Sequence, residues 1–198
     1  MLISTKLLLQ YGGETVIIKP LETIFSEGEN PRYYYQIIEG RIKLNHYNEN
    51  GKEIIQSILS AGQTVCELLL FSEEKYPMNA ETLNECKIIK IPKKNFFALL
   101  ADHPKISLDL NKFLSKRLYQ KFVMMQNNLS LLPEVRILGT LNYFKSDSSK
   151  RQRYSFEINL TRKQLASITG LRIETVIRTI KKMESEKIVK LENSKIFY

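Results

Sequence analysis

The chain has little of what membrane proteins, secreted proteins and metalloproteins are built from. No apolar run in its 198 residues approaches the roughly 18 residues that a bilayer span needs. The N-terminus lacks the basic start, long apolar core and small-residue cleavage site of a signal peptide, so we expect a cytoplasmic protein with no membrane partner. Two isolated cysteines, Cys66 and Cys86, fit a reducing compartment and cannot supply the four thiolates of a common iron–sulfur or structural zinc site.

Motifs of catalysis and cofactor binding are also missing. The sequence contains no Gly-rich phosphate loop, no His-Glu-x-x-His zinc helix and no Gly-x-Ser-x-Gly elbow, which argues against an enzyme. The only histidines, His46 and His103, stand alone in polar surroundings, and surface histidines are favoured over haem ligands. Cys66 is either a redox-sensitive thiol or, more commonly for such a residue, a small buried one. We therefore expect no metal and no cofactor.

Positive charge is concentrated in the second half of the chain. Residues 1–104 carry 11 Lys and Arg against 13 Asp and Glu, whereas residues 105–198 carry 19 against 8. This asymmetry indicates that the C-terminal half meets a polyanion and that the N-terminal half does not. A solvated basic surface would explain the charge alone, so the motifs have to decide between the two interpretations.

The first hundred residues have the pattern of a small antiparallel β-structure. Glycines recur at positions 28, 40, 51 and 62, and turns at such regular intervals are typical of a roll or barrel. Asn50-Gly51 is a strong hairpin signal, because both residues tolerate positive φ. Apolar and polar residues alternate after Gly40, Lys87–Ile91 is predicted as a closing strand, and Lys93–Ala101 as a short helix.

A single long helix is predicted over residues 104–129, before the new element that Pro133 starts, because apolar residues follow one another at steps of three or four. A helix of about 25 residues between two domains has nowhere in its own chain to bury the whole stripe. We expect it to pack against its twin in a homodimer. The alternative is a core helix that covers the β-structure, and both can hold on different faces. The predicted dimer interface is Leu110, Leu114, Leu118, Phe122, Met125 and Leu129.

The last seventy residues are predicted as three helices and a hairpin. Two short amphipathic helices flank a tight turn at Thr169-Gly170, and the pattern is that of a helix-turn-helix whose second helix enters a DNA major groove. Two short strands around Glu192-Asn193-Ser194 would form a wing after them. Before them come a helical segment over Leu131–Lys145, with Val135, Leu138, Leu141 and Phe144 as its inner face, and a polar loop over Ser146–Arg153.

The two short helices carry their own start and stop signals. Thr161 and Gln164 have the spacing of a capping box, and Gly170 supplies the left-handed residue that ends the first helix. The residues expected to anchor the pair are Leu165, Ala166 and Ile168 on the first helix and Val176, Ile180 and Met183 on the second.

The second of these helices carries side chains suited to base edges. Arg178 has the fork geometry that binds guanine O6 and N7 together, and Glu174, four residues earlier on the same face, can accept from cytosine N4. A surface ion pair is the alternative, but the capped helix, the glycine turn and the wing favour base contact. The predicted base-reading residues are Ile173, Glu174, Thr175 and Arg178, and the predicted phosphate contacts are Arg162, Arg172, Lys181 and Lys182.

The segment from Thr161 to Arg178 resembles the cyclic-AMP receptor protein / fumarate–nitrate regulator (Crp/Fnr) superfamily of bacterial transcription regulators, with Ile177 in the place of a small residue. The resemblance extends over nearly the whole chain, since Glu67–Phe71 is similar to the family's phosphate-binding cassette and Ser115–Leu118 to the middle of its dimerisation helix. It implies a palindromic operator and RNA polymerase as a partner. Because Ile173 stands where the cyclic-AMP receptor branch has Arg, it implies a half-site nearer TTGAT than TGTGA.

The resemblance breaks down in the sensor. Cys66 replaces a Gly before Glu67, and Met78-Asn79-Ala80 falls where an Arg-Ser/Thr-Ala run would hold a cyclic phosphate. A phosphate buried there without a cation would leave its charge unpaired, which argues against cyclic AMP. Lys121-Phe122 lies where the cyclic-AMP receptor has a Thr-Ser pair, although Lys121 could supply a cation for another anion. The possible effector pocket is Cys66, Glu67, Leu68, Met78, Asn79, Lys121 and Phe122.

Together these patterns predict an α+β chain in three parts: a β-roll sensor (1–103), a dimerisation helix (104–129) and a winged helix-turn-helix (130–198). The expected function is sequence-specific binding of double-stranded DNA as a homodimer, under a sensor that does not respond to cyclic AMP. The alternatives are an effector-free constitutive regulator, a regulator responsive to a cyclic nucleotide or another small anion, and a non-specific nucleic-acid binder.

Overall fold

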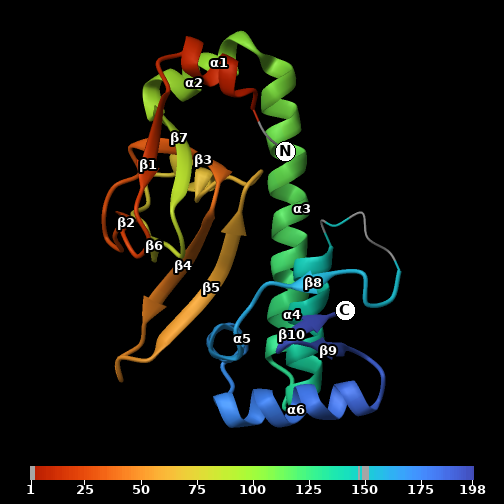
Figure 1. The fold of residues 1–198 in the computed structure, drawn as a ribbon. Helices are drawn as coiled ribbons and strands as arrows, with labels where there is room; N and C mark the ends of the chain where they lie inside the picture. Colours follow the sequence, from red (N-terminus) through yellow and green to blue (C-terminus); the bar gives the residue numbers. More distant parts are fainter. Residues whose placement is uncertain (1–2, 147, 149–151) are drawn as a thin grey trace. The chain divides into compact units, whose positions relative to one another are not determined.

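The computed structural model describes residues 3–146, 148 and 152–198. It comprises two compact units, Met1–Lys116 and Arg117–Tyr198, which share one long helix. Within the described ranges, no helix combines the length and the apolar character that crossing a membrane would require. Figure 1 shows strands gathered in the first unit and helices dominating the second, which is the α+β organisation that the sequence predicts.

The first unit is built on two antiparallel sheets that face each other as a roll (Figure 1). One sheet has the order β1-β7-β3 and the other the order β2-β6-β4-β5, so strands distant in sequence lie side by side. The predicted closing strand is β7, at the centre of the first sheet. The bounds are β1 Glu14–Ile18, β2 Thr23–Phe25, β3 Tyr33–Glu39, β4 Arg41–Tyr47, β5 Glu53–Ser60, β6 Asn79–Thr82 and β7 Cys86–Pro92.

The glycines that punctuate the sequence lie at turns of this roll, as predicted. Gly28, Gly40, Gly51 and Gly62 all have positive φ. Gly40 joins β3 to β4 with φ +94°, and a Cβ atom there would lie 2.5 Å from the backbone oxygen of Glu85. Only glycine fits this close approach, so the β3–β4 connection depends on it.

Helices close one end of the roll. They are α1 (Thr5–Gln10), the 3₁₀-helix η1 (Glu67–Phe71), α2 (Lys93–Asp102) and the first part of α3 (Pro104–Asn128). The predicted short helix after β7 and the predicted long helix are thereby confirmed, whereas α1 was not predicted. The helices pack on the β1-β7-β3 sheet through a second apolar cluster, which includes Tyr34, Ile89, Ile91, Phe96 and Leu99.

The prediction that Leu110 lies in the dimer interface is wrong, because this residue is buried within its own chain. Its side chain is 3% exposed and belongs to the apolar cluster of the first unit. Leu114 is partly buried against the same cluster. These two residues serve the core of their own chain, because the first half of α3 covers the sensor unit. The remaining stripe residues, Leu118, Phe122, Met125 and Leu129, are 52–74% exposed.

The second unit is a helical domain with a small three-stranded sheet. Its elements are α4 (Pro133–Lys145), β8 (Glu157–Ile158), α5 (Arg162–Thr169), α6 (Ile173–Ser185), β9 (Lys190–Glu192) and β10 (Lys195–Phe197). The predicted wing is confirmed: β9 and β10 pair around Asn193 and Ser194, which both adopt positive φ. The short strand β8 pairs with the other edge of β10 and was not predicted.

Helix α4 differs from its prediction in where it begins and in its buried face. It begins at Pro133, two residues later than expected. Of its predicted inner face only Leu141 is fully buried, while Val135, Leu138 and Phe144 are half-buried. Ile137, Gly139 and Thr140 are the other buried residues, because α4 is packed on several sides and not along one stripe. Residues 147 and 149–151 of the predicted polar loop lie outside the described residues.

Candidate DNA-reading helix and sensor interior

The helix-turn-helix is fixed by short-range hydrogen bonds that its sequence encodes. Thr161 and Gln164 form the predicted capping box: the Gln164 amide donates to Thr161 Oγ1 at 3.1 Å, and the Thr161 amide donates to Gln164 Oε1 at 2.9 Å. Gly170 then ends α5 with φ +71°. The capping box fixes where α5 begins, and the left-handed Gly170 sets the direction in which the chain leaves α5 toward α6.

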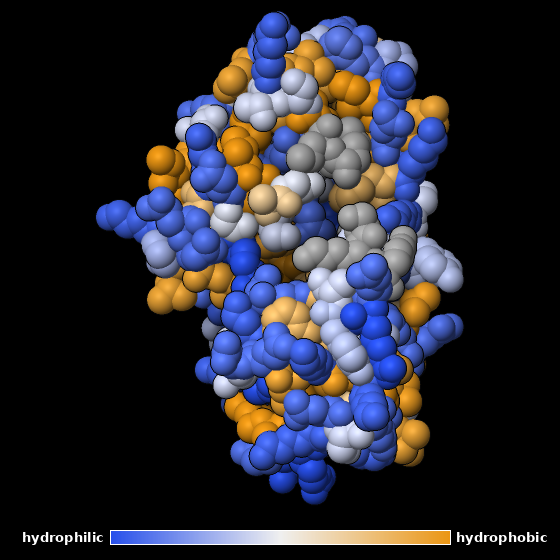
Figure 2. All heavy atoms as spheres, turned by 45° about the vertical axis from the view of Figure 1, so that its right-hand side comes forward, coloured by the Kyte–Doolittle hydropathy of each residue, from blue (hydrophilic) through white to orange (hydrophobic). Residues whose placement is uncertain are grey.

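Helix α6 has one buried face and one open face. Val176, Ile180 and Met183 are at most 1% exposed and anchor it, as predicted. The opposite face presents Glu174, Arg178 and Lys181, with Ile173 and Ile177 about two-fifths exposed beside them. Figure 2 shows hydrophilic side chains over most of the lowest part of the molecule, which α6 occupies in Figure 1, with a few apolar ones among them. This mixed surface suits a major groove, which offers polar base edges and thymine methyl groups.

Glu174 and Arg178 are both exposed and free to meet a ligand. Among the ion pairs formed by the described residues, none joins Glu174 to Arg178 or takes either of them elsewhere. The structure therefore gives no support to the alternative interpretation of this pair as a surface salt bridge. Thr175, the fourth predicted base-reading residue, is half-buried at the start of the same helix.

The predicted phosphate contacts differ in how available they are. Arg172 and Lys181 are exposed. Arg162 is half-buried, and burial lowers the pKa of its guanidinium, although Glu184 acts in the opposite direction. Lys182 Nζ lies 2.9 Å from Glu134 Oε2 and 3.4 Å from Glu186 Oε1, so a phosphate would have to compete with two carboxylates for it. Of the four predicted phosphate contacts, Lys182 therefore has the least support from the structure.

Sequence patterns missed several residues that hold the reading helix. Arg153 and Tyr154, from the segment before β8, both donate to the Lys187 carbonyl just beyond the end of α6. Asn128 and Arg136 donate to carbonyls at the end of α5. Each bond joins residues more than thirty positions apart, so no local motif marks them.

The interior of the roll is lined by aromatic side chains. The rings of Phe25 and Tyr76 are stacked with their centroids 3.6 Å apart, and Tyr35 lies 6.0 Å from Phe25. Burial raises the pKa of Tyr35 to about 12 and that of Tyr76 still further, so both hydroxyls stay neutral. Cys66, Leu69, Ala80 and Cys86 belong to the same buried cluster. The interior is thus packed by the chain's own side chains.

The cassette-like segment places Glu67 inside and Leu68 outside. Cys66 has φ +52° and precedes η1, which turns the Glu67 side chain inward until none of it is exposed. Leu68 is 52% exposed and does not line the interior. Met78 packs against the aromatic cluster, so an apolar thioether occupies the position where the family resemblance expects Arg. Both cysteines are buried thiols, and burial raises the pKa of the Cys86 thiol.

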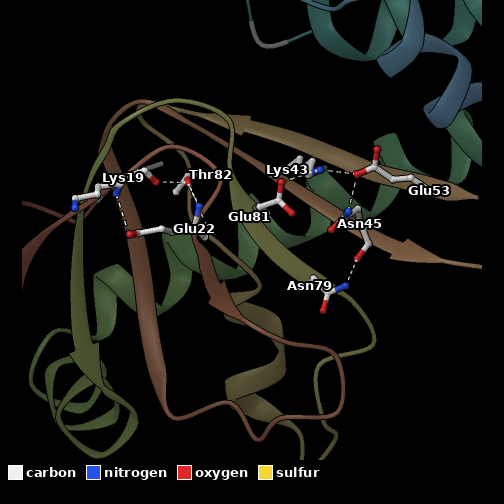
Figure 3. Close-up of polar contacts among 8 residues, drawn as sticks. All are labelled: Lys19, Glu22, Lys43, Asn45, Glu53, Asn79, Glu81 and Thr82. Carbon is white, nitrogen blue, oxygen red and sulfur yellow. Dashed lines mark hydrogen bonds and ion pairs between the residues drawn. The ribbon is translucent and has the colours of Figure 1, made fainter. Parts of the chain in front are cut away.

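Asn79 belongs to a polar network on the other face of β6. Its Oδ1 accepts from the Glu27 amide at 2.9 Å, and its Nδ2 donates to the Asn45 carbonyl at 3.4 Å. Side chains alternate along a strand, and Ala80 points into the core, so Asn79 and Glu81 point outward. Figure 3 shows the network continuing to Lys43, whose Nζ lies 2.6 Å from Glu53 and 2.9 Å from Glu81. Asn79 is committed to this network and not to the roll interior.

The remaining predicted pocket residues lie on α3 in the second unit. Lys121 Nζ lies 5.4 Å from the centre of the Tyr143 ring in a cation–π contact. Phe122 is 52% exposed. Their approach to the roll stays a prediction. The histidines were predicted to be surface residues, but both are half-buried, and Nε2 of His103 lies 3.3 Å from the Tyr11 hydroxyl.

Each of the two units contains a segment that matches a known protein-family model. Residues 15–103 match the cyclic nucleotide-binding domain, and residues 135–197 match the Crp-like helix-turn-helix domain. The chain is 30% identical over 169 residues to the cAMP-activated global transcriptional regulator CRP of Haemophilus influenzae, which covers 84% of this chain and 75% of that protein. The corresponding regulator of Salmonella typhimurium is 28% identical over the same share of this chain and 80% of its own.

Solved structures show the same fold at low sequence identity. A mutant of CooA from Carboxydothermus hydrogenoformans superimposes with a TM-score of 0.80 at 15% identity, covering 98% of this chain and 85% of its own. CLP of Xanthomonas campestris, described as a c-di-GMP responsive global regulator, gives a TM-score of 0.74 at 18% identity, covering 96% and 97%.

The chain thus combines a domain of the cyclic nucleotide-binding type with a Crp-like helix-turn-helix. This combination defines a DNA-binding transcription regulator with an effector-binding domain. The 30% sequence identity to CRP, over 84% of this chain, places the chain in one family within this class. The chain belongs to the Crp/Fnr family of transcription regulators, and it is not an enzyme.

Proposed function

We propose that this chain binds a palindromic operator as a homodimer and reads each half-site with the open face of α6. The observation that carries the proposal is the exposed Glu174–Arg178 face, which forms no ion pair with the part of the chain that the structure describes, on a helix whose other side is buried. Ile173 beside it can contact a thymine methyl. Because the family resemblance places Arg at this position in the cyclic-AMP receptor branch, Ile173 favours a half-site nearer TTGAT than TGTGA. The exposed cations Arg172 and Lys181 flank this face and would set the register on the phosphates.

The exposed half of the α3 stripe supports the homodimer. Four large apolar side chains on one helix face are a substantial solvent-exposed surface, and such surfaces mark interaction sites. We expect a second copy of α3 to cover this surface by forming a parallel helix pair. The second copy would also bring a second α6. The residues are Leu118, Phe122, Met125 and Leu129.

Competition between DNA duplexes tests the proposed function directly. We expect a duplex with two inverted TTGAT half-sites to displace a labelled copy of itself at least ten times better than a scrambled duplex of the same composition, because each wrong base pair costs about 1–3 kcal/mol. Fluorescence anisotropy at one fixed salt concentration measures both. Equal competition by the scrambled duplex would instead assign the chain to the non-specific nucleic-acid binders.

We further propose that the sensor does not respond to cyclic AMP. Met78 packs an apolar side chain where the family resemblance expects the phosphate-binding Arg, and Asn79 is held in the network on the outer face. A cyclic phosphate would therefore lose its expected cation, and burying its charge would be costly. The stacked rings of Phe25 and Tyr76 favour an interior that is complete without a ligand.

Thermal unfolding with and without cyclic AMP tests this part. A ligand present at about 100 times its Kd stabilises a protein by about 2.7 kcal/mol, which raises Tm by several degrees. We expect no change in Tm and no change in operator affinity. Cyclic di-GMP and inorganic phosphate serve as comparison ligands: a Tm rise with either would point to a sensor for another anion, and a rise with cyclic AMP would refute the proposal.

A further inference from the structure

The last turn of α3 and the first turn of α4 are hydrogen-bonded to the turn of the helix-turn-helix. Asn128 Nδ2 donates to the Ile168 carbonyl at 3.3 Å, and Arg136 Nη1 donates to the Thr169 carbonyl at 3.3 Å. Ile168 and Thr169 are the last two residues of α5, where carbonyls have no partner within their own helix. Side chains from two other helices thus supply the donors that this helix end needs.

Arg136 also holds the connection between α3 and α4. Its Nε donates to the Ser130 carbonyl at 2.5 Å, within the four-residue link that separates the two helices. One guanidinium therefore joins this link to the end of α5. Guanidinium donors are rigidly arranged, so the two carbonyls are held at a fixed separation.

The same part of α3 packs along α4 as an antiparallel neighbour. Gln120 Nε2 donates to Ser146 Oγ at 2.8 Å near one end of the pair. Near the other end, a Cβ atom on Gly139 would lie 2.5 Å from Cβ of Asn127, so the absence of a side chain there allows close contact. The second half of α3 is in this way built into the DNA-binding unit.

The Asn128 amide makes its hydrogen bond to the Ile168 carbonyl although its own oxygen loses hydration. Its Oδ1 is buried and has no hydrogen-bond partner among the described residues. An apolar side chain at this position would carry no such desolvation penalty. Apolar residues are therefore usual at buried positions that serve packing alone. The amide is therefore better explained by the bond that its nitrogen makes to α5 than by its contribution to packing.

We infer that Asn128 and Arg136 are positioning residues that lock α6 to the second half of α3 and so set the distance between the two reading helices of the dimer. The inference rests on the proposed homodimer. With these bonds in place, the second half of α3 turns together with α4, α5 and α6, and the operator must present its half-sites at one spacing. Without them, the reading helices tolerate other spacings.

Operator affinity measured as a function of half-site spacing isolates the positioning role of Asn128 and Arg136. One added base pair rotates a half-site by about 35° around the DNA axis, since a turn contains 10–10.5 base pairs. We expect the natural chain to prefer its best spacing about tenfold or more over spacings one base pair longer or shorter. In Asn128→Ala and in Arg136→Lys we expect this ratio to fall below about threefold, a loss of more than half of the preference in free energy.

Asn127→Ala is the matched control. It removes the same amide from the neighbouring residue, whose Nδ2 donates to the Val123 carbonyl of α3 itself at 2.9 Å, and alanine keeps the Cβ atom that lies against Gly139. We expect it to keep the spacing preference. All variants are also tested for discrimination of the half-site bases and for Tm, because a merely structural defect would lower Tm and overall affinity without flattening the spacing profile.

The outcomes separate the inference from the proposed function. If the natural chain shows no preference for any spaced inverted repeat, the proposed homodimer function fails. If it shows a sharp preference that Asn128→Ala and Arg136→Lys retain while folded, the function stands and the positioning role is overturned. A flattened profile with unchanged base discrimination supports the positioning role, and a profile flattened equally by Asn127→Ala overturns it.

Discussion

Replacing Arg178 by Ala is expected to abolish discrimination at one G·C pair in each half-site. Arg178 is exposed on α6, four residues after Glu174, and a bidentate contact to guanine contributes about 1–3 kcal/mol of discrimination. This corresponds to about 5- to 150-fold per half-site, and a dimer doubles the free energy because it reads two. Anisotropy titrations against operators substituted at each base pair in turn measure the effect.

Arg178→Lys separates recognition from charge. Lys retains the positive charge but lacks the planar fork, so we expect it to keep much of the overall affinity and to lose the preference for G·C at the same position. If Arg178→Ala weakens binding equally at every substituted operator, Arg178 contacts phosphate and α6 does not read bases through it.

Replacing Met125 by Glu is expected to dissociate the dimer. Met125 is 55% exposed, so a carboxylate there costs the isolated fold little. In a symmetric helix pair the two carboxylates would face each other across an apolar seam. Loss of the second reading helix forfeits an avidity of about 10²–10⁴-fold in operator affinity. Light scattering after size exclusion measures the mass, and anisotropy measures the affinity.

Lys112→Glu is the control for the Met125 variant. Lys112 lies on α3 away from the exposed stripe and forms only a 3.8 Å ion pair with Asp109, which contributes little to stability. We expect this variant to remain dimeric. A Met125→Glu chain that is still dimeric and binds its operator normally would mean that the stripe is not the dimer interface.

Local signals in the sequence account for the elements that were predicted correctly. The steps of three and four residues after Pro104 give α3, whose 25 residues end at Asn128. Thr161, Gln164 and Gly170 define α5 because caps and left-handed turns depend on neighbouring residues only. The roll and the wing follow from turn residues in the same way.

Long-range contacts account for what could not be predicted. The sequence shows a stripe through Leu110 and leaves open whether each part of it faces a second copy or the β-structure, whereas the structure buries its first part against the sensor unit. The insertion of β7 between β1 and β3 and the pairing of β8 with β10 depend on register across many residues. Asn128 and Arg136 have no motif, because an amide and a guanidinium that meet a distant carbonyl look like ordinary surface residues.

In the sensor, two residues separate the fold from the ligand chemistry that the family resemblance expects. The chain keeps the roll and the buried Glu67 of a cyclic nucleotide-binding domain. Met78 and Asn79 nevertheless belong to an apolar cluster and to a structural polar network. The proposed insensitivity to cyclic AMP rests on these two residues, because a fold alone does not imply a function.

Selection of binding sites from a pool of random duplexes by the purified chain tests the central claim most directly. The account predicts an enriched inverted repeat with a G·C pair at the same position in each half, and the loss of that pair from the repeat selected by Arg178→Ala. Enrichment of no sequence, or of a motif without a dyad that is unchanged in Arg178→Ala, would contradict it.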